Sequence, residues 1–294
     1  MECFHFLSIK QMNRQDILEV LQQAQEMKTN CLDALLKNKV MAGCFFEPST
    51  RTRLSFESAM KRLGGEVIGF TNPEETSTKK GESLEDTIKV ISLYSDIIIL
   101  RHPAEGAAAR AAAVSSVPVI NAGDGAHEHP TQTLTDLFSI HACQNRLDQL
   151  NIAFMGDLLY SRTVHSLALA MNHFKNRLYF ISPPSLSLPD WVSRQLNSPF
   201  SRHGTLEEVI DQIDILYVTR MQKERHLTSD PSTWSVSVEV LEKGRSHLKV
   251  LHPLPRQQEI TPALDATPYA YYFNQAKNGL YVRQALLARC LGAR

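Results

Sequence analysis

The sequence predicts an α/β protein with two domains, each built from a mostly parallel sheet flanked by helices. Short apolar runs typical of buried strands alternate along the chain with amphipathic helical patterns. This alternation stops at a polar stretch, residues 144–149, and then starts again. A chain of 294 residues is long enough for two medium-sized domains. Two packed α/β units are therefore favoured.

The first predicted domain begins with an amphipathic segment and continues with strands and helices in turn. An apolar run at residues 40–46 predicts a strand, and residues 49–63 predict a helix that ends at Gly64 and Gly65. Further strands are expected at residues 67–70, 97–100 and 117–120, with helices at 84–93 and 104–113 between them.

The second predicted domain has strands at residues 152–155, 178–181, 215–218 and 250–252. A helix at residues 131–142 would connect the domains, and an apolar helix at 280–291 could pack back on the first domain. We therefore place the first domain at residues 1–143 together with 275–294, and the second at residues 144–274.

Charge and cysteine usage exclude several classes of protein. Lys plus Arg and Asp plus Glu both number 31, so there is no overall basic field to attract nucleic acid or an anionic membrane. No leader pattern follows Met1 and no run approaches the roughly 18 apolar residues of a membrane span, so we expect a cytoplasmic protein. The scattered cysteines predict inert, reduced thiols: Cys3, Cys31, Cys44, Cys143 and Cys290.

The stretch FFEPSTRTR, residues 45–53, ends a predicted strand and opens a predicted helix. The first N–H groups of a helix have no internal partners and the dipole is positive there, so an oxyanion can accept hydrogen bonds from them. Arg51 adds a bidentate donor. The alternative is that Ser49 only caps the helix. The two arginines and two threonines beside it favour an anion site.

Two more stretches of the first domain carry polar groups at predicted strand ends. Arg101 follows an apolar run, and in open parallel sheets ligands bind at that edge; the alternative is a surface ion pair. His129 stands at a helix entrance, where the dipole favours a neutral imidazole that donates to a carbonyl oxygen. His127, Glu128 and His129 could also indicate a metal cluster, but their spacing argues against one.

The second domain supplies three polar segments, also at predicted strand ends: residues 156–163, 219–222 and 252–256. Their arginines suit a dicarboxylate. The turn after Gly156 lacks the G-x-G-x-x-G pattern of dinucleotide-binding proteins.

Together these motifs resemble the aspartate carbamoyltransferase family, over residues 45–287. The sequence carries S-T-R-T at residues 49–52, R-H-P-x-E-G from Arg101, H-P-T-Q at 129–132 and H-P-L-P-R at 252–256. Pro253 stands where ornithine-specific relatives typically have cysteine, which favours aspartate. The resemblance implies transfer of the carbamoyl group of carbamoyl phosphate to L-aspartate, a step of de novo pyrimidine biosynthesis. It implies no metal and no organic cofactor, and an active site in the cleft between the domains.

The resemblance also assigns roles to single residues. The phosphate would be held by Ser49, Thr50, Arg51 and Thr52. The carbamoyl carbonyl oxygen would accept from Thr52, Arg101 and His129. The carbamoyl NH₂ would donate to Gln132 and to the backbone carbonyls of Leu254 and Pro255. The aspartate carboxylates would be bound by Arg162, Arg220, Gln222 and Lys80.

A shared loop at residues 76–81 would send Ser77 and Lys80 into the site of a neighbouring subunit, which implies a catalytic homotrimer. Glu47 and Arg225 resemble residues that hold a closed state of the family's enzymes. A larger assembly with regulatory or other chains is left open.

The chain departs from the family pattern at a few positions. Leu159 and Ser161 stand where the family commonly has lysine and glycine, residues 226–228 form a small insertion, and Thr233 replaces an acidic residue usual in allosteric relatives. These changes spare the substrate residues but put in question the contacts of a low-affinity state.

The sequence leaves three alternative functions. A carbamoyltransferase for another amino acid is the nearest, and a non-catalytic relative is opposed by the intact site residues. A nucleotide-binding module is opposed by the missing glycine-rich loops.

Overall fold

The computed structural model describes residues 4–30, 32–72, 74, 76–222 and 234–293. The chain divides into two compact units, Met1–Leu134 with Asn278–Arg294, and Thr135–Lys277. Both boundaries fall inside helices, α5 (Pro130–Gln144) and α9 (Tyr272–Cys290), so each of these helices contributes to both units. The finer domain limits stay a prediction.

The first unit contains a four-stranded sheet with the strand order β2, β1, β3, β4, and all neighbouring strands are parallel. Besides α5 and α9, its elements are α1 (Arg14–Thr29), β1 (Val40–Phe45), α2 (Thr50–Arg62), β2 (Glu66–Phe70), α3 (Leu84–Ser92), β3 (Ile97–His102), α4 (Ala107–Val114) and β4 (Val119–Asp124). The predicted strands are present. β3 and β4 run further than predicted, so Arg101 and Asp124 lie within strands.

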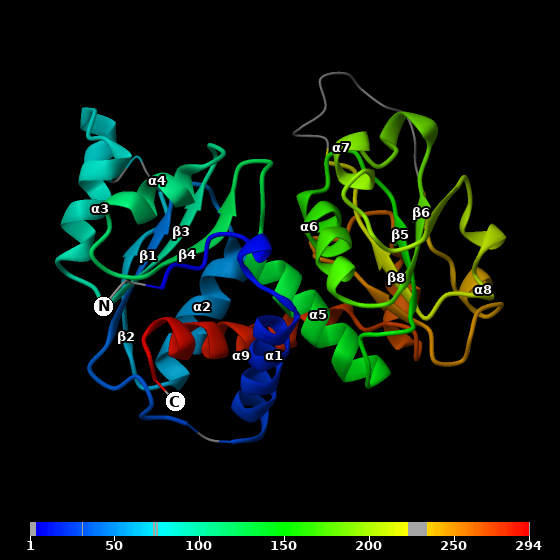
Figure 1. Ribbon diagram of the computed structural model, residues 1–294, viewed down its shortest axis with the longest axis horizontal. Helices are drawn as coiled ribbons and strands as arrows, with labels where there is room; N and C mark the ends of the chain where they lie inside the picture. Colours follow the sequence, from blue (N-terminus) through cyan, green and yellow to red (C-terminus); the bar gives the residue numbers. More distant parts are fainter. Residues whose placement is uncertain (1–3, 31, 73, 75, 223–233, 294) are drawn as a thin grey trace. The chain divides into compact units, whose positions relative to one another are not determined.

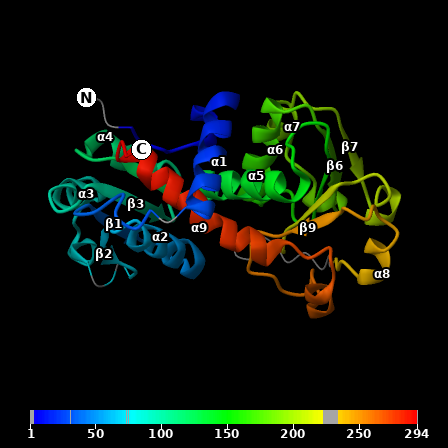
Figure 2. The ribbon, with the colours of Figure 1, turned by 90° about the horizontal axis from the view of Figure 1, so that it is seen from below.

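Helices cover both faces of this sheet (Figure 1). One face packs on α3 and α4 through a cluster that includes Cys44, Leu100 and Ala111. On the other side, α2 lies with α1 and α9 (Figure 2). The guanidinium of Arg283 on α9 sits 5.2 Å from the centre of the Phe56 ring on α2. The strands β1, β3 and β4 are therefore largely buried, which explains their apolar runs, whereas the edge strand β2 is mostly exposed.

The second unit contains a five-stranded parallel sheet with the order β7, β6, β5, β8, β9. Its elements are β5 (Asn151–Met155), α6 (Arg162–Ala170), β6 (Arg177–Ile181), α7 (Asp190–Ser193), β7 (Phe200–His203), β8 (Ile215–Val218), α8 (Val238–Leu241) and β9 (Lys249–Leu251). The four predicted strands are present, and β7 is an additional edge strand. β7 escaped prediction because its sequence, FSRH, contains no apolar run.

Side chains of the second sheet alternate between its two faces, as a strand requires. Ala153 and Met155 of β5 join a large apolar cluster with Leu216 and Val250. Phe154 points the other way, and its ring centre lies 5.4 Å from that of Phe180. The predicted two-domain α/β fold is confirmed.

Each sheet contains one pair of adjacent strands whose onward connections run to opposite sides of the sheet. In the first sheet, β1 connects to β2 on one side and the adjacent β3 connects to β4 on the other. In the second, β5 connects to β6 and the adjacent β8 connects to β9 in the same manner. Open α/β sheets bind ligands at the carboxyl ends of such strand pairs. The site residues are therefore expected at or after the ends of β1, β3, β5 and β8.

None of the helices in the described part of the chain is both long enough and apolar enough for a membrane crossing. Cys44, Cys143 and Cys290 are free thiols. Burial raises the pKa of the Cys44 and Cys143 thiols to about 12, so both are protonated and unreactive at neutral pH. The prediction of reduced thiols is confirmed for these three; Cys3 and Cys31 lie outside the described residues.

Candidate active site

The start of α2 presents the predicted anion-binding residues directly after β1. Ser49 occupies the N-cap position, but its hydroxyl makes no capping hydrogen bond, so the simple capping interpretation is wrong. The first helical hydrogen bond comes from the Arg53 N–H, which donates to the Ser49 carbonyl at 3.1 Å. Thr50 and Arg51 are exposed on the first turn, while Thr52 is buried. The turn thus offers hydroxyls and a guanidinium beside a positive helix end.

Arg101 lies near the carboxyl end of β3, beside β1. Its guanidinium donates to the Ala122 carbonyl at 3.2 Å and pairs with the Glu47 carboxylate at 2.8 Å. The Arg101 side chain is only 12% exposed, so its position is fixed by these contacts. Arg101 does form an ion pair, as the alternative interpretation expected, but its side chain is largely enclosed and does not lie on the open surface.

The imidazole of His129 lies between two hydroxyls. Its Nε2 atom is 3.4 Å from Thr52 Oγ1, and its Nδ1 atom is 3.4 Å from Thr131 Oγ1. The ring is buried and immediately precedes α5. Gln132 follows on the first turn of that helix and is partly buried. The structure thus joins two predicted site residues, Thr52 and His129, across 77 positions of sequence.

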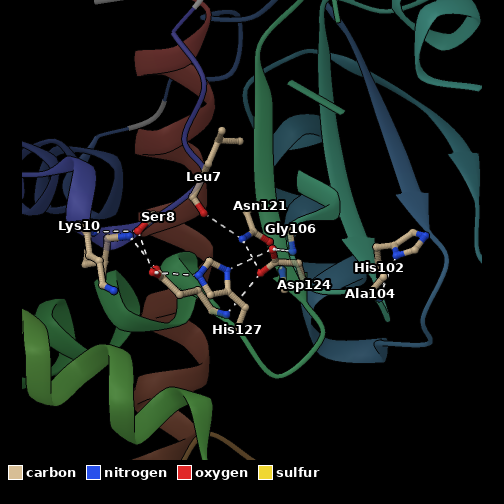
Figure 3. A network of polar contacts seen from close by, with 12 residues as sticks. Leu7, Ser8, Lys10, His102, Ala104, Gly106, Asn121, Asp124 and His127 are labelled. Atoms are coloured by element: carbon tan, nitrogen blue, oxygen red, sulfur yellow. Dashed lines mark hydrogen bonds and ion pairs between the residues drawn. The ribbon is translucent and has the colours of Figure 1, made fainter. Parts of the chain in front are cut away.

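Buried carboxylates brace the loop that carries His129 (Figure 3). Asp124, at the end of β4, accepts hydrogen bonds from the Asn121 side chain at 3.0 Å and from the Gly106 N–H at 3.1 Å. The Glu128 carboxylate accepts from the Ser8 hydroxyl at 2.8 Å and lies next to His129 in the chain. The loop before His129 is therefore tied both to α4 and to the N-terminal segment.

His127 and Glu128 do not form a metal site with the described residues around them. His127 is half exposed, and its Nδ1 atom lies 3.3 Å from Asp124 Oδ2. Across the described part of the chain, no group of three or more His, Cys, Asp or Glu side chains could hold a metal ion.

Ser77 and Lys80 lie on a single 3-10 turn, Ser77–Lys80, that ends at Gly81 with φ of 91°. Both side chains are exposed. Among the described residues of this chain, no hydrogen bond or ion pair joins either of them to Thr52 or His129.

In the second unit, the predicted aspartate-binding residues lie at the carboxyl ends of β5 and β8. Arg162 is the first residue of α6, and its side chain is buried. Arg220 follows β8, and its guanidinium donates to the Met221 carbonyl at 2.8 Å. The Gln222 side-chain amide donates to the Arg220 carbonyl at 3.3 Å. Adjacent strand ends thus bring two arginines from separate motifs to the same edge of one sheet.

Asp157 connects these two strand ends. It is fully buried after β5, and its carboxylate accepts from the Tyr160 N–H at 3.0 Å and the Gln222 N–H at 2.9 Å. A Cβ at Gly156, just before it, would lie 2.2 Å from the Thr219 carbonyl, so the close approach of the two segments requires glycine.

The segment around Leu254 and Pro255 belongs to the second unit, whereas the other residues predicted to bind carbamoyl phosphate belong to the first. The Leu254 N–H donates to His252 Nδ1 at 2.8 Å, so His252 carries its proton on Nε2 and donates to Glu259 at 2.9 Å. Burial works to raise the pKa of Glu259, but this bond and backbone N–H groups outweigh it and the pKa lies below its ordinary value. The predicted residues Arg225, 226–228 and Thr233 lie outside the described residues.

Comparisons with known proteins identify the family of this chain. The family model of the aspartate/ornithine carbamoyltransferase carbamoyl-P binding domain matches residues 5–142. The model of the Asp/Orn binding domain of the same family matches residues 148–290. The chain belongs to the aspartate/ornithine carbamoyltransferase family. The predicted family is thereby confirmed.

Within this carbamoyltransferase family, the chain is similar to curated aspartate carbamoyltransferase catalytic subunits. It is 52% identical to the Vibrio campbellii protein, over 98% of this chain and 96% of the relative. It is 50% identical to the Chromobacterium violaceum protein, over 98% and 97%.

Solved structures of aspartate transcarbamoylases have the same fold. The M. jannaschii catalytic subunit superposes with a TM-score of 0.91 at 46% identity, covering 98% of both chains. The Trypanosoma cruzi enzyme in complex with N-(phosphonacetyl)-L-aspartic acid superposes with a TM-score of 0.90 at 36% identity, covering 97% of this chain and 94% of that one.

The candidate site also contains supporting residues to which the sequence motifs gave no role. Asp157 could have been suspected, because an acidic residue directly after a buried strand needs a partner. The contact between Ser8 and Glu128 had no such signal, because it joins residues 120 positions apart.

Proposed function

We propose that this chain transfers the carbamoyl group of carbamoyl phosphate to the amine of L-aspartate, giving N-carbamoyl-L-aspartate and phosphate. The observation that carries this proposal is the pair of Thr52 and His129, buried side by side next to the exposed first turn of α2. Donors that lie beside an anion-binding helix end suit an acyl phosphate, whose phosphate and carbonyl oxygen both need hydrogen bonds.

Carbamoyl phosphate would bind first through its phosphate. The N–H groups at the start of α2 and the hydroxyls of Ser49 and Thr50 donate to the phosphate oxygens, and Arg51 adds a charged pair of hydrogen bonds. The Ser49 hydroxyl supports this role, because it makes no capping hydrogen bond to α2.

The reacting step places negative charge on the carbamoyl oxygen. The amine nitrogen of aspartate attacks the carbamoyl carbon, the bond from that carbon to the phosphate oxygen breaks, and phosphate leaves. Thr52, Arg101 and His129 donate to the carbonyl oxygen as it becomes charged, and one such donor typically contributes about 10²- to 10³-fold to the rate. The amine's proton can leave on the phosphate, so no covalent enzyme intermediate and no dedicated protein base are needed.

Further residues would orient the two substrates. Gln132 and the backbone carbonyls of Leu254 and Pro255 accept from the carbamoyl NH₂, which fixes the plane of the group. Arg162, Arg220 and Gln222 bind the aspartate carboxylates. The enclosed position of Arg162 and the placement of Arg220 at the neighbouring strand end support this assignment.

Lys80 and Ser77 would complete the site of a neighbouring subunit in a homotrimer. Their exposure on a compact turn supports this role, because both side chains can reach a second molecule. The cytoplasmic location rests on the sequence and stays a prediction.

The proposal is tested by incubating the purified chain with carbamoyl phosphate and L-aspartate and measuring both carbamoyl aspartate and phosphate. We expect the two products in equal amounts, and no carbamoylated product when L-ornithine replaces aspartate. Faster reaction with ornithine would overturn the substrate assignment. Release of phosphate without carbamoyl aspartate would overturn the transfer itself.

A further inference from the structure

Ser161 lies at a junction between the two strand ends that carry the predicted aspartate-binding residues. It immediately precedes α6 and is 2% exposed, yet its hydroxyl makes no capping bond to that helix. Instead, Ser161 Oγ lies 3.2 Å from Thr163 Oγ1 and 3.2 Å from Thr219 Oγ1. The hydroxyl therefore joins the segment after β5 to the segment after β8.

The hydrogen bonds continue from Thr219 toward the predicted substrate residues. The side-chain amide of Gln222 donates to Thr219 Oγ1 at 3.4 Å. Thr219 Oγ1 also lies 3.5 Å from the carbonyl oxygen of Arg220, the next residue in the chain. The Thr219 hydroxyl thus contacts both the Gln222 side chain and the backbone at the start of the Arg220 segment.

In the other direction, the hydrogen bonds lead into the core of the second unit. Thr163 hydrogen-bonds to the Tyr217 hydroxyl, which donates to the Asp136 carboxylate at 2.9 Å. Asp136 accepts from the Gln275 side chain at 2.6 Å, and Gln275 in turn accepts from the His252 N–H at 2.8 Å.

A series of polar contacts thus runs from Gln222 to His252. The turn before α6 contributes the Ser161 hydroxyl to it, and Asp157 of the same turn accepts from the Gln222 N–H. Thr219, Tyr217 and Asp136 are fully buried. A buried network of this kind holds its members in one arrangement, because each unmade hydrogen bond there is costly.

We propose that Ser161 is a positioning residue for the amino-acid substrate, whose hydroxyl holds the Arg162 end of α6 in register with the Thr219–Arg220 strand end. This inference rests on the proposed function and adds a residue to it. Two arginines can bind two carboxylates of one small molecule only if their separation is fixed, and Ser161 and Thr219 directly precede those arginines in the chain.

The first test compares Ser161→Ala with the wild type in steady-state assays. We expect the KM for aspartate to rise about two- to tenfold, the effect of one lost hydrogen bond, with little change in the KM for carbamoyl phosphate. The dissociation constant of N-(phosphonacetyl)-L-aspartic acid should rise by a similar factor. An unchanged aspartate KM in a folded variant would overturn the proposal.

A second variant separates positioning from general stability. Thr219→Val keeps the shape of the side chain but removes the partner hydroxyl. If the two hydroxyls act together, the double variant Ser161→Ala with Thr219→Val should raise the aspartate KM by less than the product of the two single effects. Effects that multiply would mean that the hydroxyls act independently, which contradicts the proposal.

Ser198→Ala is the matched control. Ser198 is also a buried serine of the second unit, but it precedes β7 and so lies at the opposite edge of the sheet. Its replacement should leave the aspartate KM unchanged. An equal rise of the aspartate KM in the Ser198 variant would contradict the positioning role of Ser161. If the wild type forms no carbamoyl aspartate, the proposed function and this inference fall together. If the wild type is active and Ser161→Ala matches it, only this inference falls.

Discussion

The carboxylate of Asp157 accepts a hydrogen bond from the backbone N–H of Gln222 at 2.9 Å, and this contact joins the ends of two neighbouring parallel strands. The same carboxylate accepts from the Tyr160 N–H, so it shapes the turn that leads to Arg162. A buried polar group is retained only where hydrogen bonds compensate its desolvation. Here those bonds also set where the predicted substrate side chains emerge.

Asp157 is not among the residues predicted to contact the substrate. Replacing it by Asn should nevertheless weaken aspartate binding. The amide has one acceptor where the carboxylate has two, so an N–H of Tyr160 or Gln222 would face a donor in a buried site. We expect the aspartate KM to rise at least about tenfold. Glu242→Gln, an exposed carboxylate beyond α8, is the control in the same assay. An unaltered KM in the folded Asp157 variant would show that the two strand ends are held by other contacts.

Replacing Arg51 and replacing Arg53, both near the start of α2, should have different effects on kcat/KM for carbamoyl phosphate. Arg51 is exposed on the first turn, whereas Arg53 pairs with Glu57 along the helix at 3.0 Å. Arg51→Ala should lower kcat/KM for carbamoyl phosphate by at least about a hundredfold, because it removes a charged donor to the phosphate. Arg53→Ala should cost far less. Equal losses in the two variants would contradict the assignment of the phosphate to Arg51.

The candidate residues could be located from the sequence because they lie at the ends of apolar strands or shortly after them. Arg101 is near the end of β3 in the first sheet and Arg220 is two residues after β8 in the second, and within each parallel sheet such strand ends lie at one edge. The supporting contacts follow no local pattern. Asp136 and Gln275 meet across 139 positions, and nothing near either residue in the sequence indicates the other. Ser49 shows a further limit, since its position predicts a cap that its hydroxyl does not form.

Arg220 should contribute mainly to aspartate binding. Arg220→Ala removes a charged donor, so the aspartate KM should rise about ten- to a hundredfold while the KM for carbamoyl phosphate stays within about twofold. Arg177→Ala is the matched control, because that arginine is exposed at the amino end of β6, away from the predicted site. A larger change for carbamoyl phosphate than for aspartate would reverse the assignment.

The proposed sharing of sites between subunits makes a complementation experiment possible. Lys80→Ala and Arg51→Ala chains should each be nearly inactive, because each lacks one part of every site. When the two are mixed under conditions that exchange subunits, some sites receive an intact Lys80 from one chain and an intact Arg51 from the other. Activity should then reappear, measured as carbamoyl aspartate. No recovery in a mixture shown by mass to contain both chains would contradict the shared site.

Asp214 should make the stability of the second unit depend on pH. Burial alone would raise its pKa, but hydrogen bonds from the Asn151 N–H, His247 and Arg245 outweigh burial and hold the pKa below 3.8. The carboxylate side chain is fully buried, with Arg245 at 2.6 Å. A carboxylate whose folded pKa is depressed contributes stability that is present above its unfolded pKa and lost as the pH falls through the folded value.

Asp214→Asn should accordingly lower the free energy of unfolding at pH 7 by about 1–3 kcal/mol, because the amide cannot accept all of these hydrogen bonds. The difference from the wild type should shrink as the pH falls below the unfolded pKa of about 4 and through the lower pKa of the folded carboxylate. Urea unfolding at several pH values measures both effects. Asp211→Asn, an exposed neighbour in the same turn, is the control. A difference that grew as the pH fell would have the wrong sign for a carboxylate stabilised in its charged form.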